Sequence, residues 1–128
     1  MPVTHVINWY AGWGMILAAF GTGAAVGLFF HRDDFWGGYA SFRRRIVRLG
    51  HIALAALGMI NLLYALSPWP AVEAWQGVWA GRLWIVGGIS MAVVCFLSGW
   101  REALRHLFAV PVAALCAAVV LTLIGGKG

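Results

Sequence analysis

Three of the four histidines stand at or near the ends of long apolar segments: His31 follows the first, His51 lies just inside the second, and His106 begins the fourth. If these segments are antiparallel helices, the three imidazoles lie on the same side of the molecule, next to Asp33 and Asp34. Two imidazoles from facing helices can ligate haem iron. An ionisable residue inside a membrane segment is also a candidate functional residue by default. Two imidazoles with an aspartate could also hold a metal, so His51, His106 and His31 are the candidate ligands for haem b, a quinone or a metal.

The competing interpretation of these histidines is structural. His31 and His106 fall at segment boundaries, so only His51 lies inside an apolar segment. A haem held by two histidines normally needs both ligands deeper than the first helical turn, because the helices must enclose the macrocycle. The chain has no CxxCH motif for covalent haem, and we predict no metal site. We expect His51 to hydrogen-bond a neighbouring helix or another subunit, with haem b or a quinone as the alternative.

A basic and aromatic segment leads into the second apolar segment. Its arginines are Arg43, Arg44, Arg45 and Arg48, and they follow Phe35, Trp36, Tyr39 and Phe42. Each basic residue near an anionic membrane surface contributes about 1 kcal/mol to binding the lipid headgroups. Nucleic acid would also attract arginines, but this segment is too apolar and too close to the predicted membrane. Anionic lipid headgroups are the predicted partners of the four arginines, and nucleic acid is not.

Small residues recur at helical spacing in the first apolar segment. Gly23 and Gly27 form a GxxxG motif, and Ala19 extends the same face by one turn. Small residues let two helix backbones approach closely, which matters in lipid because no hydrophobic drive brings helices together there. Asn61 in the second segment can add a hydrogen bond between helices worth about 0.6–2 kcal/mol. We predict that Ala19, Gly23, Gly27 and Asn61 pack against a partner helix, which the pattern allows to be internal or foreign.

No arrangement of residues typical of an enzyme is present. The sequence contains no Walker loop, no HExxH motif and no evident nucleophile–base pair. Cys95 and Cys116 lie inside apolar segments rather than in a CxxC pair, so we expect them to behave as small apolar residues. The first apolar segment contains no acidic residue, which argues against proton-coupled antiport. These features favour a protein that is not an enzyme.

The elements that position these residues follow from the composition. Of 128 residues, 62% are hydrophobic and 10% are charged, against about 45–50% and about 25% in soluble domains. This composition excludes a disordered chain and a disulfide-stapled secreted scaffold. A membrane-crossing helix needs about 20 largely apolar residues. Four segments meet or approach that length, at about residues 7–30, 46–66, 83–97 and 107–124, which predicts an all-α integral membrane protein.

Short connections between these segments predict an up-down four-helix bundle, formed as a single membrane domain over residues 1–128. A further short helix is expected at about residues 70–81, where apolar residues recur at helical spacing. Because indole rings prefer the membrane–water interface, we expect this short helix to lie in the outer interface. Its predicted anchors and those of the neighbouring helix are Trp69, Trp75, Trp79 and Trp84.

The basic residues predict the orientation. The first connection with the start of the second segment, and the third connection, contain Arg32, Arg43, Arg44, Arg45, Arg48, Arg101 and Arg105. The other side has only Arg82 and Lys127. Since Lys and Arg accumulate on the cytoplasmic side, both termini are predicted to lie outside, most simply in a bacterial cytoplasmic (inner) membrane.

The leading functional prediction is an accessory, non-catalytic integral-membrane subunit of a larger complex, in respiratory or photosynthetic electron transfer. The assembly part follows from the small residues and the missing catalytic groups. The electron-transfer part follows from the many tryptophans and the histidines on the inner side. The alternative is a membrane electron carrier that binds haem b or a quinone through the inner histidines. A third hypothesis is a small stand-alone oligomer that binds or transports lipid.

Overall fold

The computed structural model of the chain describes residues 2–67 and 74–126, and every element in them is helical. The long helices are α1 (Val3–Phe29), α2 (Phe42–Leu66), α3 (Trp75–Trp100) and α4 (Ala109–Gly125). Two 3-10 helices, η1 (Phe35–Gly37) and η3 (Glu102–Phe108), lie between them. Four helical segments are long and apolar enough to cross a membrane, the fourth being η3 together with α4. The prediction of an all-helical protein with four such helices is confirmed, and it indicates an integral membrane protein.

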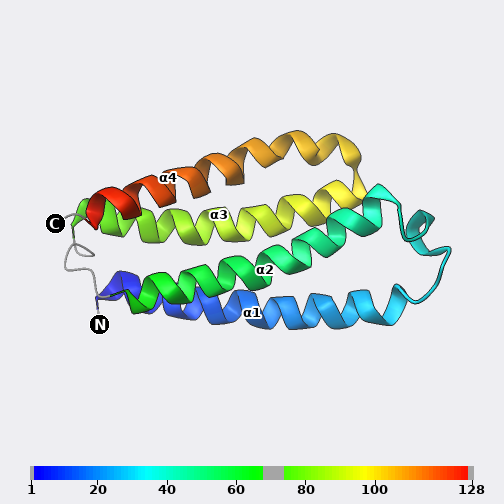
Figure 1. Cartoon of the computed structure of the whole chain (residues 1–128), viewed down its shortest axis with the longest axis horizontal. Helices are drawn as coiled ribbons and strands as arrows, with labels where there is room; N and C mark the ends of the chain where they lie inside the picture. Colours follow the sequence, from blue (N-terminus) through cyan, green and yellow to red (C-terminus); the bar gives the residue numbers. More distant parts are fainter. Residues whose placement is uncertain (1, 68–73, 127–128) are drawn as a thin grey trace.

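Consecutive helices run in opposite directions and lie side by side in the order α1, α2, α3, α4 (Figure 1). α1, α2 and α3 all contact one another, whereas α4 packs chiefly against α3. The connections from α1 to α2 and from α3 to α4 meet at one end of the molecule (Figure 1). We call this the arginine-rich end, after the seven arginines named above for these connections, and the opposite end, where α1 begins and α4 finishes, the terminal end.

The turn between α1 and α2 is formed by residues suited to it. Gly37 and Gly38 have positive φ angles of 84° and 88°, a conformation that glycine adopts without steric cost. α2 then begins after Ser41, whose hydroxyl accepts a hydrogen bond from the backbone N–H of Arg44 at 3.3 Å. This is the usual way in which serine satisfies a free donor at a helix start.

One predicted element is wrong. The separate interfacial helix expected at 70–81 does not exist as such, because residues 75–81 form the first turns of α3, which continues without a break to Trp100. Residues 70–73 lie outside the described residues. The segment was expected to lie flat because its tryptophans suggested an interface. Gly77, Ala80 and Gly81 instead face the interior and are buried, so small residues let this segment pack as part of an upright helix.

α1 and α2 approach most closely at a pair of glycines. A Cβ atom added to Gly12 would lie 2.8 Å from the carbonyl oxygen of Gly58, and one added to Gly58 would lie 2.9 Å from the carbonyl oxygen of Gly12. Only glycine allows two backbones to meet at that distance. The interior continues from this crossing through Met15, Leu54 and Ala92, which bring α1, α2 and α3 together in one apolar cluster.

Candidate functional site

His51 packs against α1 rather than facing an open site. Its Nδ1 atom lies 3.3 Å from Thr22 Oγ1, and a Cβ atom added to Gly23 would lie 2.5 Å from Cε1 of the ring. Thr22 donates its hydroxyl proton to the carbonyl of Ala18 at 2.8 Å, so Nδ1 is the donor in the contact with Thr22. The imidazole therefore fills the space between α1 and α2, as the structural interpretation expects, and the contact is within this chain.

The other two predicted ligands lie elsewhere. His31 follows α1 in a turn, His106 belongs to η3, and both are exposed. The described residues contain no group of three or more His, Cys, Asp or Glu side chains that could hold a metal ion. Because the ring of His51 already contacts the backbone of α1, this position has no room for a macrocycle between the two helices. The geometry thus gives no support to a haem held between α1 and α2 by His51.

Two asparagines form the polar centre of the helix packing, which we call the amide cluster. Asn8 Nδ2 donates to Asn61 Oδ1 at 2.8 Å and to the carbonyl oxygen of Gly81 at 3.0 Å. Asn61 Nδ2 donates to the carbonyl oxygens of Leu57 at 2.9 Å and Trp84 at 3.3 Å. Asn8 is 1% exposed and Asn61 is 0% exposed. The cluster joins α1, α2 and α3, so Asn61 binds helices of this chain and not a foreign partner.

Two further hydrogen bonds extend this polar region toward α4 and the start of α3. The Tyr64 hydroxyl donates to the carbonyl oxygen of Gly77 at 2.5 Å. Trp84 Nε1 donates to the hydroxyl of Thr122 at 3.1 Å, which links α3 to α4. Trp84 is 9% exposed, so the prediction that it anchors the chain in the membrane interface is wrong. An indole can be buried where its N–H finds an acceptor, and Thr122 supplies one here.

The remaining tryptophans differ from Trp84. Trp75 and Trp79 are 65% and 51% exposed, and the guanidinium of Arg82 lies 5.3 Å from the centre of the Trp79 ring. Exposed indoles beside a cation near a helix end are compatible with interfacial anchoring. Trp69 lies outside the described residues.

The small face predicted on α1 is used largely inside the chain. Ala19 is 2% exposed and belongs to the apolar cluster of α1, α2 and α3, and Gly23 lies under the His51 ring. Of the internal and foreign partner helices that the sequence left open, the structure shows an internal one for these two residues. Gly27 is exposed, and a Cβ atom added to it would meet no atom of the described residues within 4 Å. The GxxxG spacing indicated close packing, but the face of α1 that packs is the one toward α2.

The role of Arg44 also differs from the prediction. Its guanidinium donates to the carbonyl oxygens of Phe30 and Arg32 and lies 4.6 Å from the centre of the Phe30 ring. The residue is only 2% exposed. A cation at the free carbonyls that end a helix is stabilising, because it complements the helix dipole. Arg44 therefore closes the end of α1 and is not available to lipid headgroups.

The other arginines of the group remain near the surface. Arg43 and Arg45 are exposed, and Arg48 is half-buried with its guanidinium 4.5 Å from the centre of the Tyr39 ring. A hydrogen bond from Arg48, together with its charge, lowers the pKa of the Tyr39 hydroxyl from its usual value of 10.0. Contact with lipid headgroups stays a prediction for these three arginines.

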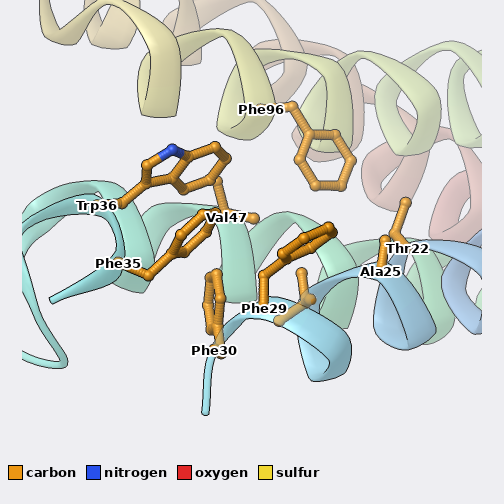
Figure 2. A pocket seen from close by; sticks show the side chains of 9 residues that line it. Thr22, Ala25, Phe29, Phe30, Phe35, Trp36, Val47 and Phe96 are labelled. Atoms are coloured by element: carbon orange, nitrogen blue, oxygen red, sulfur yellow. The ribbon is translucent and has the colours of Figure 1, made fainter. Parts of the chain in front are cut away.

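A cavity of about 330 Å³, which we call the aromatic pocket, lies at the arginine-rich end. Figure 2 shows the rings of Phe29, Phe30, Phe35 and Trp36 grouped on one side, with Phe96 projecting toward them from α3. Thr22, Ala25, Val26 and Val47 complete the lining. Thr22 is the only lining residue that is neither aromatic nor aliphatic. The volume falls within the range of about 300–1,000 Å³ typical of ligand sites.

A second cavity of about 500 Å³ adjoins the aromatic pocket. Trp36 and Phe96 line both cavities, and Arg43, Gly99 and Trp100 complete the second one, which we call the arginine cavity. Of the described residues, no acidic side chain lines either cavity. The two cavities thus share an indole and a phenyl ring, and only the second one has a basic residue in its lining.

The backbone of Trp36 is in an unfavourable conformation. Its φ and ψ angles are 53° and 38°, in the left-handed region that costs a residue other than glycine about 1–2 kcal/mol. Its ring stacks on Phe35, with centroids 4.9 Å apart and an angle of 19° between the planes. Such outliers are uncommon for bulky residues and cluster at functional sites. The unfavourable angles keep the indole between the two cavities.

Three important residues escaped the sequence analysis as site residues. The role of Asn8 could have been predicted, because an amide in an apolar helix needs a hydrogen-bond partner and Asn61 was the obvious candidate. Trp36 and Phe96 were not detectable, since aromatic residues near a membrane interface are common and no pattern indicates a left-handed backbone at a tryptophan. No family model, curated protein or solved structure matches the chain.

Proposed function

We propose that the protein is a non-catalytic integral-membrane subunit that assembles with other membrane helices through the outward face of α1. The observation that carries this proposal is a stripe of small residues, Gly14, Ala18 and Gly21, at the spacing i, i+4, i+7. All three are exposed, and a Cβ atom added to Gly14 or Gly21 would meet no atom of the described residues within 4 Å. We call these three residues the α1 stripe.

The contrast with α4 supports this choice of surface. α4 also exposes small residues, at Ala109, Ala113 and Cys116, but none of them is glycine, and its Val120 and Leu123 are 51% and 63% exposed. Two of the three residues in the α1 stripe are glycines, which have no side chain to keep a second backbone away. Small residues on the outside of a membrane helix leave room for a second backbone to approach. The α1 stripe replaces Ala19 and Gly23 as the proposed partner surface.

The proposal includes an orientation. The arginine-rich end lies on the cytoplasmic side of a bacterial inner membrane, and the terminal end lies outside, because Lys and Arg accumulate on the cytoplasmic side. The four helices then cross the bilayer as an up-down bundle. Trp75 and Trp79, exposed on the first turns of α3, reach the outer interface in this arrangement.

The partner complex belongs, in this proposal, to respiratory or photosynthetic electron transfer. This part of the proposal is supported by the many tryptophans and the histidines in the sequence. The contacts of His51 in the structure do not add to that support. The alternative, an electron carrier with haem b, predicts a Soret band and a reduced-minus-oxidised difference spectrum that disappear in His51→Ala. A wild-type protein purified without such bands excludes that alternative.

Co-purification from the native membrane tests the assembly. Gly21→Leu is expected to reduce the amount of partner polypeptides recovered in mild detergent at least tenfold, while insertion and helicity stay unchanged. Gly27→Leu is the matched control, because Gly27 is also open but lies about 120° around the helix from Gly21, at 3.6 residues per turn. Undiminished recovery with Gly21→Leu, or equal loss with Gly27→Leu, would show that the α1 stripe is not the partner surface.

Disulfide cross-linking then separates a foreign partner from a second copy of the chain. Cys116 is exposed and Cys95 is buried, so Gly21→Cys is introduced together with Cys116→Ser. A second copy packed on the same stripe gives a covalent dimer upon mild oxidation, which would favour the stand-alone oligomer. The proposal expects the monomer to persist in this experiment, with partners still recovered in the reduced sample.

A further inference from the structure

We propose that the arginine-rich end holds one anionic phospholipid, with an acyl chain in the aromatic pocket and its phosphate at Arg43. The inference concerns a different surface from the α1 stripe and does not depend on the assembly. It joins three observations that the proposed function does not use: the two adjoining cavities, the cation in only one of them, and the strained tryptophan between them.

The aromatic pocket suits a hydrocarbon chain. Its rings come from the end of α1, from η1 and from α3, and Figure 2 shows them enclosing the same space. The single hydroxyl in the lining, on Thr22, already donates to the carbonyl of Ala18 and contacts His51. The indole N–H of Trp36 is the other donor in the lining, so a polar head placed here would lose more hydrogen bonds to water than it gains, which is costly. An acyl chain has no such need.

The arginine cavity suits the phosphate. Arg43 is exposed and lines this cavity, and a guanidinium binds phosphate oxygens through charge-assisted, often paired, hydrogen bonds. Trp100, at 78% exposed, stands at the same cavity near the end of α3, where an indole prefers the headgroup level of a membrane. The cationic cavity thus adjoins the apolar one at the level where the head of a membrane lipid lies.

Trp36 connects the two parts of the site. Its indole lines both cavities, and its left-handed backbone would relax if the ring were not needed there. Strain of this kind persists where the surroundings fix the side chain, and it is frequent at ligand clamps. We infer that Trp36 lies beside the glycerol region, between the acyl chain and the phosphate.

This chemistry distinguishes a phospholipid from a quinone. A quinone head needs hydrogen-bond donors for its two carbonyl oxygens, and the lining of the aromatic pocket offers few: the Thr22 hydroxyl already donates to Ala18, which leaves the indole N–H of Trp36. The guanidinium of Arg43 is a permanent charge, so it favours an anionic head over a neutral one. The occupant is therefore an anionic lipid of the adjacent leaflet.

Thermal unfolding of the full chain in dodecyl maltoside tests the site. Dioleoyl phosphatidylglycerol should raise the Tm of the wild type, since a ligand that binds only the folded state stabilises it, whereas dioleoyl phosphatidylcholine should have less than half that effect. Arg43→Gln should raise the half-saturating phosphatidylglycerol concentration about fivefold, which corresponds to about 1 kcal/mol for one basic residue at the lipid surface. Arg45→Gln, an exposed neighbour that lines neither cavity, should leave it unchanged.

A second pair of variants tests the acyl-chain part. Ala25→Leu places a larger side chain at the wall of the aromatic pocket and should reduce the phosphatidylglycerol shift by more than half. Ala113→Leu, the same change on the exposed surface of α4, should retain it. Arg43→Lys keeps the charge and should retain most of the preference for phosphatidylglycerol, even if Arg43→Gln folds poorly.

Three outcomes would overturn the proposal. Equal Tm shifts with phosphatidylglycerol and phosphatidylcholine would mean that the lipid acts only as a general solvent for the helices. An unchanged response in both Arg43→Gln and Ala25→Leu would place the lipid elsewhere. A shift produced by decylubiquinone but not by phosphatidylglycerol would identify a quinone as the occupant. Each of these results leaves the test of the α1 stripe unaffected.

Discussion

The polar side chains at the two ends of α2 lie in different environments. Near the terminal end, Asn61 is completely buried and its amide bonds α1 and α3. Near the arginine-rich end, Arg44 donates to the carbonyls that end α1, and Arg43 lines a cavity that the chain does not fill. One helix thus contributes to a closed polar cluster at one end and to the frame of an open pocket at the other.

This difference separates residues that hold the fold from residues that bind. In the amide cluster, a side chain that lost its partner would leave a donor or acceptor in a place without water, so the cluster stabilises one arrangement of α1, α2 and α3. The aromatic pocket has no such requirement, because apolar walls lose only packing when the space is empty. We therefore expect substitutions in the amide cluster to change stability, and substitutions at the pocket to change lipid binding.

Asn61→Leu should have the largest effect on stability. It removes the acceptor of Asn8 and two donor bonds to backbone carbonyls, each worth about 0.6–2 kcal/mol in a membrane protein. The free energy of unfolding in mixed micelles should fall by about 2–3 kcal/mol. Met59→Leu, on the exposed side of the same helix, should leave the free energy of unfolding within about 0.5 kcal/mol of the wild-type value. An equal loss in both would mean that helix packing, and not the amide cluster, determines stability here.

Arg44→Gln should come next. It removes a charged donor from the carbonyls that end α1, and hydrogen bonds to charged groups contribute about 1.5–3 kcal/mol. We expect unfolding free energy to fall by about 2 kcal/mol and the phosphatidylglycerol response to weaken, because the turn that carries Trp36 loses its support. Arg45→Gln removes the same charge from an exposed position. If Arg45→Gln lowered the free energy of unfolding by a similar amount, the loss in Arg44→Gln would come from the change in net charge and not from the lost hydrogen bonds at the end of α1.

Gly23→Ala tests the region between the two ends of α2. It should lower the free energy of unfolding by about 1 kcal/mol, the lower end of the range for overpacking. The added Cβ would lie 2.5 Å from His51 Cε1, so the imidazole has to move. Gly27→Ala, four residues along and in open space, should be neutral within about 0.5 kcal/mol. In a His51→Ala background the cost of Gly23→Ala should disappear. If it persists there, the contact with His51 is not its cause.

Trp36→Gly should have the smallest effect on stability. Relief of the left-handed conformation gains about 1–2 kcal/mol, and the lost stacking on Phe35 costs about 0.5–1.5 kcal/mol. Without lipid, the unfolding free energy should therefore stay within about 1 kcal/mol of the wild type. The Tm shift with phosphatidylglycerol should nevertheless be lost. A retained shift would show that Trp36 is not part of the lipid site.

The number and nature of the helices could be predicted from the sequence because they depend on length and composition alone. The faces of those helices could not. A helix that is apolar nearly all round gives no periodic signal for its inward side, so the sequence could not decide whether Ala19 and Gly23 pack on this chain or on a foreign helix. The same lack of periodicity hid the burial of Trp84.

The candidate site was harder to predict than the fold. Arg44 stood in a group of four arginines, and nothing in its neighbours distinguishes the one whose guanidinium turns back to the carbonyls of Phe30 and Arg32. The aromatic pocket depends on Phe96, which follows Trp36 by 60 positions in the chain. Contacts between such distant positions depend on the rotation of each helix about its axis, and composition carries no information about that rotation.

The hydrogen bonds of Asn8 also have a consequence for the synthesis of the chain. Asn8 is in α1, which is made before α2 and α3, and its acceptors are separated from it by 53 and 73 positions, on Asn61 and Gly81. A newly inserted α1 therefore carries an amide without these partners until α2 follows, and the second acceptor arrives only with α3. Biogenesis should thus proceed as a hairpin of α1 and α2 that α3 locks, and a chain stopped before α3 should be removed by quality-control proteases faster than the chain with all four helices.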